Sequence, residues 1–287
     1  MLKKIIKRAR NLINRKGLYD RYKKILSLNV KIKNTKTGKL CFIMGNGPSL
    51  KNIDLTSLRN EETFVVNTFW NHERYKDIDP KYYVLTDTKI FPQPGQVPET
   101  YNNWNRVVVE KSNVVNSCPK TKFFLDIGTK DFIESSKIYP KNEIFYLMLS
   151  GYFKDNHNFD IDISKPIPRT KNVILAALII AVYMGFEEIY LMGCEHDYLA
   201  HPRLYAGFKH FYEQKPLDQD NKEEAAYYTL DVMPYEEHIV QSLILFKNYR
   251  LFKERLAKTN PNVKIYNATP NSFLDVFPNI KFDEIKL

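Results

Sequence analysis

The chain has 287 residues, of which 44% are hydrophobic, so it can bury the core of one large α/β domain or of a domain with a helical lobe. Residues 1–40 hold 14 Lys and Arg against one acid, a net charge of +13, which leaves −3 for the rest of a chain whose total is +10. Because the basic residues belong to an arm and the remaining body is slightly acidic, the charge pattern argues against a nucleic-acid groove across the fold.

The three cysteines, Cys41, Cys118 and Cys194, lie far apart in the sequence and lack the spacing of a metal site. An odd number of scattered cysteines indicates reduced thiols in a cytoplasmic compartment. The sequence therefore predicts no structural disulfide and no zinc site.

The N-terminal arm, defined here as residues 1–39, begins with a basic amphipathic pattern. Its Lys and Arg residues alternate at helical spacing with six apolar residues, Leu2, Ile5, Ile6, Ala9, Leu12 and Ile13. Helices of this kind lie on anionic membrane surfaces, where each basic residue contributes about 1 kcal/mol. We therefore expect residues 1–34 to hold the protein peripherally at the inner face of the membrane; the alternative is a helix docked on its own domain or on a partner subunit. No stretch is long enough to span a bilayer, and no secretory signal is present.

The first strong signal in the body of the chain is a strand that runs into a glycine turn. Residues 40–44 are apolar and predict a buried strand, and Gly45, Asn46, Gly47, Pro48 and Ser49 follow at once. We expect a helix to start here, with Ser49 as its cap. Such a turn presents backbone N–H groups at the edge of a sheet and suits a phosphate; the alternative is a tight turn without a ligand.

Further strands are predicted along the chain at residues 63–66, 82–85, 106–109, 122–125, 144–147, 189–192 and 263–266. Asn46, Asn67 and Asp87 each follow a predicted strand directly or within two residues. In an open α/β sheet, residues just beyond the carboxyl ends of the strands line the ligand crevice. We therefore predict these three side chains near a ligand, although each one alone is also a common turn residue.

A second strong signal lies in residues 169–197. Arg169, Thr170 and Asn172 precede an almost entirely apolar helix over residues 173–184, so they are candidates for binding a carboxylate or phosphate. The strand at 189–192 then ends in Gly193, and Glu195 and His196 follow it.

The aromatic and charged segment 198–235 is interpreted as a lid or small lobe, with a surface insertion as the alternative. It contains Tyr198, His201 and Tyr205. A long helix follows at 236–258, with Ile239, Leu243, Phe246 and Leu256 among its expected buried positions and His238 in its first turn.

Three motifs together carry a resemblance to a known family: residues 45–50 (GNGPSL), 185–193 (GFEEIYLMG) and 265–272 (IYNATPNS). The chain resembles the family 42 bacterial sialyltransferases and, more closely, a wider group of polysaccharide-locus proteins related to 6-hydroxymethylpterin diphosphokinase-like domains. The resemblance covers about residues 40–280 and excludes the arm. It implies a Rossmann-like domain over residues 40–287, with a mostly parallel sheet, helices on both faces and a lid.

The resemblance also implies a function: inverting, metal-independent transfer of a nonulosonic acid from a CMP-activated donor to a hydroxyl of a cell-surface glycan or glycolipid. No cofactor is implied, and a homo-oligomer is possible in this group. The implied nucleotide and donor residues are Gly45, Asn46, Gly47, Ser49, Asn67, Asp87, Gly193 and Glu195. Asp87 stands where the family has Asn, and Glu195 stands where it has Asp.

Two further departures concern the chemistry. Residues 169–173 read Arg-Thr-Lys-Asn-Val, where the sialyltransferases have Arg-x-Thr-Ser-Gly to receive the donor carboxylate. Their general base is a histidine between the lid and the long helix; His238 is the nearest candidate, with His196 and His201 as rivals. Tyr198 and Tyr205 are candidates for stabilising the leaving phosphate.

Two other functions fit the same residues. One is a Mg²⁺-dependent pterin or nucleotide pyrophosphokinase, for which Glu195 and Asp197 form the available acidic pair. The other is a non-catalytic member of a capsule-assembly complex. No Asp-x-Asp pair directly follows a predicted strand, which favours a metal-independent transferase over a metal-bridged one.

Overall fold

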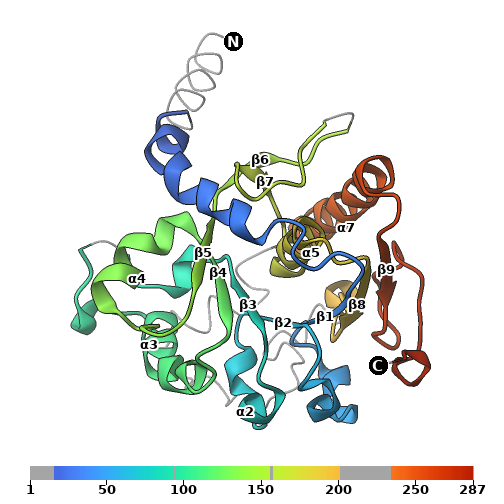
Figure 1. Cartoon of the computed structure of the whole chain (residues 1–287), viewed down its shortest axis with the longest axis horizontal. Helices are drawn as coiled ribbons and strands as arrows, with labels where there is room; N and C mark the ends of the chain where they lie inside the picture. The colour runs from blue at the N-terminus through green and yellow to red at the C-terminus, as the bar shows by residue number, and fades with distance from the viewer. Residues whose placement is uncertain (1–15, 94, 156–157, 201–233, 287) are drawn as a thin grey trace.

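The computed structural model describes residues 16–93, 95–155, 158–200 and 234–286 (Figure 1). Its centre is a parallel sheet of seven strands in the order β5-β4-β3-β2-β1-β8-β9. These strands are β1 (Leu40–Met44), β2 (Thr63–Val66), β3 (Tyr82–Leu85), β4 (Lys122–Asp126), β5 (Ile144–Leu147), β8 (Glu188–Met192) and β9 (Lys264–Asn267). All seven lie within a residue of predicted strands, and the chain has the Rossmann-like α/β fold.

Helices cover both faces of this sheet (Figure 1). They are α2 (Tyr75–Ile78), α3 (Asn103–Asn116), α4 (Lys130–Ser136), α5 (Val173–Met184) and α7 (Tyr235–Thr259). A two-stranded parallel ribbon is formed by β6 (Leu149–Tyr152) and β7 (Ile167–Arg169). Short 3-10 helices are η1 (Leu28–Ile32), η2 (Pro48–Asn52), η3 (Leu55–Leu58), η4 (Phe69–Asn71), η5 (Thr88–Ile90), η6 (Pro98–Thr100), η7 (Ile127–Thr129), η8 (Tyr198–Ala200) and η10 (Phe282–Glu284).

The direction in which the sheet grows reverses at β1. The chain adds β2 to β5 on one side of β1 and then places β8 and β9 on the other side. Ligands of open α/β sheets bind beyond the carboxyl ends of the strands at such a topological switch point. Met44 pairs with Met192, so Gly45 and Gly193 follow at the same level. The loops after β1 and β8 therefore border the expected crevice.

Alternate side chains of each strand enter two hydrophobic clusters, one on each face of the sheet. On one face, Cys41 and Ile43 of β1 belong with α5, α7 and the segment around β7. On the other face, Phe42 and Met44 belong with α2, α3 and α4. The sheet is thus buried on both sides, which is why its strands read as continuous apolar runs.

Helix α5 is defined by its ends as well as by its composition. The Asn172 side chain caps its start, with Oδ1 accepting a hydrogen bond of 3.1 Å from the backbone N–H of Leu175. Gly185 ends it in the left-handed conformation, with φ of 94°, a region that glycine enters at little cost. Every residue of α5 is buried, because β6, β7 and α7 surround it on the side away from the sheet.

The predicted strand at residues 106–109 is wrong, because this segment lies inside α3. Its run of three valines has high β propensity. The Asn102 side chain, however, caps the helix by accepting from the N–H of Asn105 at 2.9 Å, and Val108 and Val115 fall on one helical side that enters the core. Packing and capping therefore outweigh the propensity of the valines.

Helix α7 is present as predicted but turns a different side to the core. Ile239 and Leu243, expected to be buried, are exposed, and Phe246 is only partly buried. The buried residues are Ser242, Leu245, Asn248, Tyr249, Leu251, Phe252 and Leu256. The prediction is wrong here because apolar residues occur all round the first half of α7, so hydrophobicity alone does not define the packed side.

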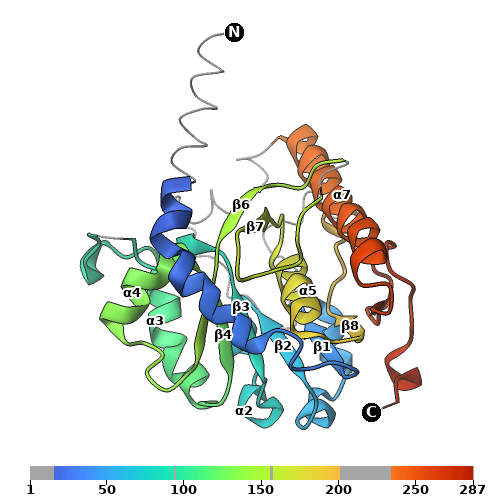
Figure 2. The ribbon, with the colours of Figure 1, turned by 45° about the horizontal axis from the view of Figure 1, so that its top comes forward.

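The described part of the arm packs on the domain. Residues 16–27 are helical and continue into η1, where the buried Asn29 side chain donates hydrogen bonds to the carbonyls of Tyr146 (2.8 Å) and Ile163 (2.7 Å). After η1 the chain forms a turn whose N–H groups at Asn34 and Lys36 donate to the end of α5. Self-docking thus holds for residues 16–32, and residues 1–15 lie outside the described part. Figure 2 shows the docked helix beside β6.

All three cysteines are free and buried. Among the helices of the described residues, none is both long enough and apolar enough to cross a membrane.

Candidate functional site

The glycine turn after β1 lies directly against the loop after β8. The backbone N–H of Gly45 donates to the carbonyl of Met192 at 2.8 Å, and that of Gly47 donates to the carbonyl of Gly193 at 3.0 Å. A Cβ atom at Gly45 would clash with the carbonyl oxygen of Gly193, and one at Gly47 would clash with the carboxylate of Glu195. The two glycines are therefore explained by close approach of two loops.

A carboxylate of the chain itself occupies the place predicted for a phosphate. Oε1 of Glu195 accepts a hydrogen bond of 2.8 Å from the N–H of Ser49. The helix predicted after the turn is absent, because only the five-residue η2 forms, with Gly47 rather than Ser49 at its N-cap. The Ser49 hydroxyl is buried and has no hydrogen-bond partner among the described residues.

The ends of β1 and β2 are joined by an asparagine. Nδ2 of Asn46 donates to the carbonyl of Val66 at 3.2 Å and to the hydroxyl of Thr68 at 3.4 Å. Asn67 adopts the left-handed conformation, with φ of 47°, and its carbonyl accepts from the Tyr83 hydroxyl at 2.6 Å. The structure thus brings the two predicted asparagines to neighbouring strand ends.

Two aspartates lie at the carboxyl ends of neighbouring strands, Asp87 two residues beyond β3 and Asp126 as the last residue of β4. Asp87 caps η5 by accepting from the N–H of Lys89 at 2.9 Å, and Asp126 caps η7 by accepting from the N–H of Gly128 at 2.8 Å. Burial raises the pKa of Asp126, and the negative charge of Asp87 adds to this, while the Arg169 guanidinium acts in the opposite direction. Asp126 was missed at the sequence level, although it directly follows a predicted strand, which is the signal that found Asp87.

A buried polar cluster, formed by Asn172, His196 and Tyr249, joins the start of α5, the loop after β8 and the middle of α7. Nε2 of His196 lies 2.9 Å from Nδ2 of Asn172 and 3.0 Å from the Tyr249 hydroxyl. The Tyr249 hydroxyl also lies 2.9 Å from Nδ2 of Asn172. Tyr249 was not predicted, because nothing in the sequence of α7 distinguishes it from other core aromatics.

Burial within this cluster determines the charge of His196. Its residues are largely withdrawn from solvent, with His196 only 6% exposed and Tyr249 fully buried. Burial lowers the pKa of His196 to about 4, so the imidazole is neutral at pH 7. A neutral imidazole whose Nε2 already contacts two polar groups is a poor acceptor for a substrate proton.

The structure describes only some of the remaining predicted site residues. His238 lies half-buried in the first turn of α7, and the hydroxyl of Thr170 is buried without a partner among the described residues. The backbone of Tyr198 forms the start of η8. His201, Tyr205 and the lid as a whole lie outside the described residues, as does the side chain of Tyr198.

The third motif holds the loop after β8 in place. The hydroxyl of Thr269 accepts from the N–H of Cys194 at 3.0 Å, and the hydroxyl of Ser272 donates to the carbonyl of Cys194 at 2.6 Å. The N–H of Phe273 donates to the carbonyl of Glu195 at 2.8 Å. The three motifs, far apart in the sequence, therefore meet at residues 193–196.

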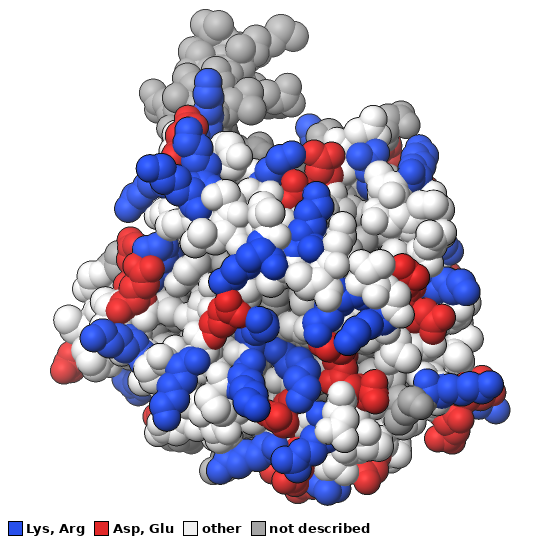
Figure 3. Space-filling model, in the orientation of Figure 1, with Lys and Arg blue, Asp and Glu red and all other residues white. Residues whose placement is uncertain are grey.

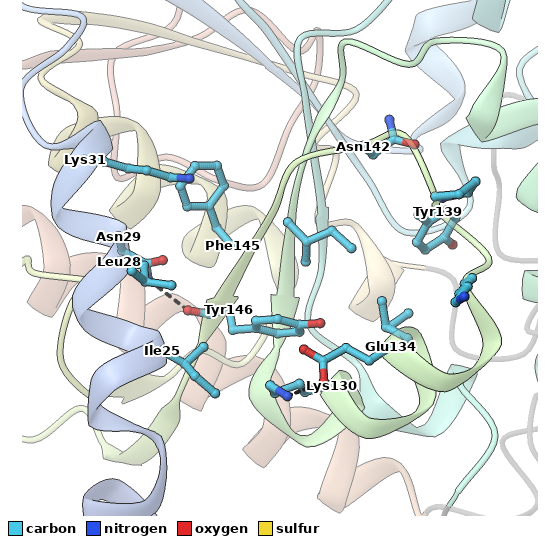
Figure 4. Close-up of a pocket in the computed structure, with 14 residues that line it drawn as sticks. Ile25, Leu28, Asn29, Lys31, Lys130, Glu134, Tyr139, Asn142, Phe145 and Tyr146 are labelled. Carbon is cyan, nitrogen blue, oxygen red and sulfur yellow. Dashed lines mark hydrogen bonds and ion pairs between the residues drawn. The ribbon is translucent and has the colours of Figure 1, made fainter.

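The described residues contain no group of three His, Cys, Asp or Glu side chains that could hold a metal ion. A cavity of about 470 Å³ lies elsewhere, between the docked arm and α4, and Figure 4 shows its lining. Lys31, Lys130 and Glu134 border it, together with Ile25 and Tyr146. It runs along β5 rather than at the carboxyl ends of β1 and β8, so it does not belong to the crevice.

Fold and site together define a Rossmann-like α/β protein with polar loops at its topological switch point, where ligands of such folds bind. No family model matches the chain, and no curated protein matches it in sequence. Among solved structures, its fold is similar to that of the MAf glycosyltransferase from Magnetospirillum magneticum AMB-1, with a TM-score of 0.47 and 12% identity. The match covers 94% of this chain and 39% of that one, so this chain spans well under half of its length. The similarity concerns the fold alone.

Proposed function

We propose that the protein is a glycosyltransferase that moves a nonulosonic acid or a similar sugar from a CMP-activated donor to a glycan hydroxyl. The observation that carries this proposal is the meeting of the three motifs at residues 193–196, where they form one wall of the crevice. Their likeness to the family 42 sialyltransferases supports a nucleotide-sugar donor. Asn46, Asn67 and Glu195 supply both donors and acceptors, which suits ribose hydroxyls and a nucleobase edge.

Donor binding in this proposal is an exchange at the glycine turn. The N–H of Ser49 is held by the carboxylate of Glu195, and those of Gly45 and Gly47 are held by backbone carbonyls. A nucleotide phosphate would displace Glu195 from Ser49, and the released carboxylate would then accept hydrogen bonds from ribose hydroxyls. Because one anion replaces another, the N–H of Ser49 keeps a charged hydrogen-bond acceptor after the exchange.

The transfer needs a base for the acceptor hydroxyl and stabilisation of the departing cytidylate. We propose His238 as the base. The acceptor oxygen would bond to the anomeric carbon from the face opposite the phosphate, the carbon–phosphate oxygen bond would break, and the acceptor proton would pass to His238. This route inverts the anomeric centre and needs no metal. His201 remains a rival base, with Tyr198 and Tyr205 as proposed contacts of the leaving phosphate.

Ligand-dependent thermal stability tests this function. We expect CMP to raise the melting temperature of the full chain in the presence of EDTA. A ligand that binds only the native state stabilises it, and the shift should grow with the CMP concentration. Asn46→Ala should abolish this shift, because it removes the amide that joins the ends of β1 and β2. Asn116→Ala is the matched control, since its side chain donates to the carbonyl of Ile138 at 2.8 Å, outside the crevice. An equal CMP shift in Asn46→Ala and the parent would contradict the assignment.

The neighbouring carboxylates of Asp87 and Asp126 favour one second candidate, a Mg²⁺-dependent pyrophosphokinase, because paired acids at strand ends suit a phosphate-bound metal. Stabilisation by ATP with Mg²⁺, but not by CMP, would identify that activity. No shift with either nucleotide would leave the protein as a scaffold.

A further inference from the structure

The outward side of helix α7 changes character halfway along its length. In its first half this side is apolar, with exposed fractions of 46% for Ile239, 45% for Val240, 65% for Leu243 and 41% for Ile244. One turn later the same side carries Lys247, Arg250 and Glu254, with the two basic residues held in ion pairs. The opposite side is buried from Ser242 onward, whereas none of residues 235–241 is buried. Only the first half of α7 therefore presents an apolar surface, named here the α7 stripe (Tyr235, Ile239, Val240, Leu243 and Ile244).

The stripe lies at the crevice end of the molecule. Helix α7 ends beside the start of β9, where Lys264 donates to the carbonyl of Glu187, so its beginning points toward the carboxyl ends of the strands. The Tyr235 hydroxyl lies 3.5 Å from the carbonyl of Leu199, in the segment that follows β8. The first turns of α7 therefore lie on the side of the sheet where the strands end, beside the segment that follows β8 and near the expected crevice.

The docked arm helix begins at the same end. Its far end leads into the turn at Asn34, which donates to the end of α5, so the helix runs toward the amino ends of the strands and begins near their carboxyl ends. The segment of β6 and β7 lies between the two helices: Ile163 accepts from Asn29 of the arm, and Asp155 pairs with Lys247 and Arg250 of α7. Figure 2 shows this arrangement, with the starts of both helices at the top.

The arm supplies the charge that the stripe lacks. Residues 16–27 contain Lys16, Arg21, Lys23 and Lys24 against the single acid Asp20, and Leu18 is 43% exposed among them. Basic side chains interspersed with exposed apolar ones complement an anionic lipid surface. The first turn of α7 carries Glu236 and Glu237, so α7 would act by inserting apolar side chains and the arm by charge.

We propose that the α7 stripe and the start of the arm helix form one membrane-docking face, which seats the protein on an anionic bilayer with the crevice mouth toward the lipid headgroups. This orientation places a hydroxyl carried on a lipid within reach of the site. If the proposed transferase function holds, the acceptor is therefore a lipid-linked glycan rather than a free one. The docking itself does not depend on that function.

Vesicle sedimentation with the full chain tests the face, using phosphatidylcholine vesicles with and without 30% phosphatidylglycerol. We expect binding only to the anionic vesicles. Leu243→Asp should weaken it at least tenfold, the loss that follows from no longer burying one leucine in the bilayer. Lys23→Glu with Lys24→Glu should weaken it about thirtyfold in low salt. Val30→Asp is the matched control and should stay within twofold, because Val30 is 56% exposed but lies at the other end of the arm.

A variant expected to bind more tightly distinguishes a loss of docking from a loss of folding. Leu243→Trp should bind the anionic vesicles more tightly than the parent, because tryptophan favours the membrane interface.

Unchanged vesicle binding in both Leu243 variants would overturn the proposal. So would a Leu243→Asp protein that instead changes from dimer to monomer in light scattering, which would make a second copy the occupant of the stripe. A lower melting temperature with unchanged vesicle binding would overturn it too, because the stripe would then be covered by the chain's own residues. Vesicle binding without a CMP shift would leave the docking face standing and remove the proposed function.

Discussion

Two places in the crevice were predicted to bind an anion, the glycine turn after β1 and the start of α5, and the chain fills them in different ways. At the glycine turn the N–H of Ser49 is held by the charged, half-buried side chain of Glu195. At the start of α5 the N–H of Leu175 is held by Asn172, a neutral side chain that is itself fixed by His196 and Tyr249. The first contact is the one that the proposed function exchanges for a ligand, whereas the second is part of the core.

The largest effect should come from breaking the fixed site. Asn172→Ala removes the cap of α5 and takes one buried hydrogen-bond partner from His196 and one from Tyr249, so we expect a loss of about 4 kcal/mol of unfolding free energy. Asn102→Ala is the control, because Asn102 caps α3 through one backbone contact only and should cost about 1 kcal/mol. Urea denaturation measures both. Equal losses would mean that the polar cluster adds nothing to the cap.

Acid should act on the same cluster through His196. Because its pKa is lowered to about 4 in the folded protein, against an ordinary value of about 6.5, the unfolded chain binds a proton between these pH values and the native state does not. Its contribution is therefore fully present above about pH 6.5 and is lost as the pH falls toward 4, by about 3 kcal/mol. Urea titrations between pH 7 and 4 measure this slope. His196→Gln should flatten it, and an unchanged slope would show that another group causes the acid loss.

The smallest effects should separate the two glycines of the glycine turn, Gly45 and Gly47. Gly45→Ala places a methyl group against the backbone carbonyl of Gly193, which cannot move without its strand, and should cost about 2 kcal/mol. Gly47→Ala meets only the end of the flexible Glu195 side chain and should cost under about 1 kcal/mol. Thermal denaturation of the two variants gives the comparison. A larger loss for Gly47→Ala would show that Glu195 is as firmly fixed as Asn172.

Much of the sheet could be predicted because its strands are buried on both faces and so appear as short apolar runs. Residues 63–66 and 82–85 are such runs, and their ends directed attention to Asn67 and Asp87. The error at residues 106–109 has the same origin, since three valines resemble a buried strand until the cap at Asn102 and the core contacts of Val108 are known.

The partners of the site residues could not be predicted in the same way. Nothing in the sequence links Glu195 to Ser49, which lies 146 residues earlier, or Tyr249 to Asn172, which lies 77 residues earlier. These contacts arise because parallel strands bring distant loops to one edge of the sheet. The sequence therefore indicated which strand ends carry polar residues but not whether a ligand or the chain itself satisfies them.

By itself, the sequence determined most strands of the sheet, the buried helix α5 and the basic arm, because each depends on local composition and on the spacing of apolar residues. Only the tertiary structure decided that residues 16–32 of the arm pack on the domain, that Glu195 holds the glycine turn, and that half of α7 faces outward with apolar side chains. Those outcomes depend on which surfaces meet when the chain closes, and apolar periodicity does not encode that choice when a helix is hydrophobic on every side.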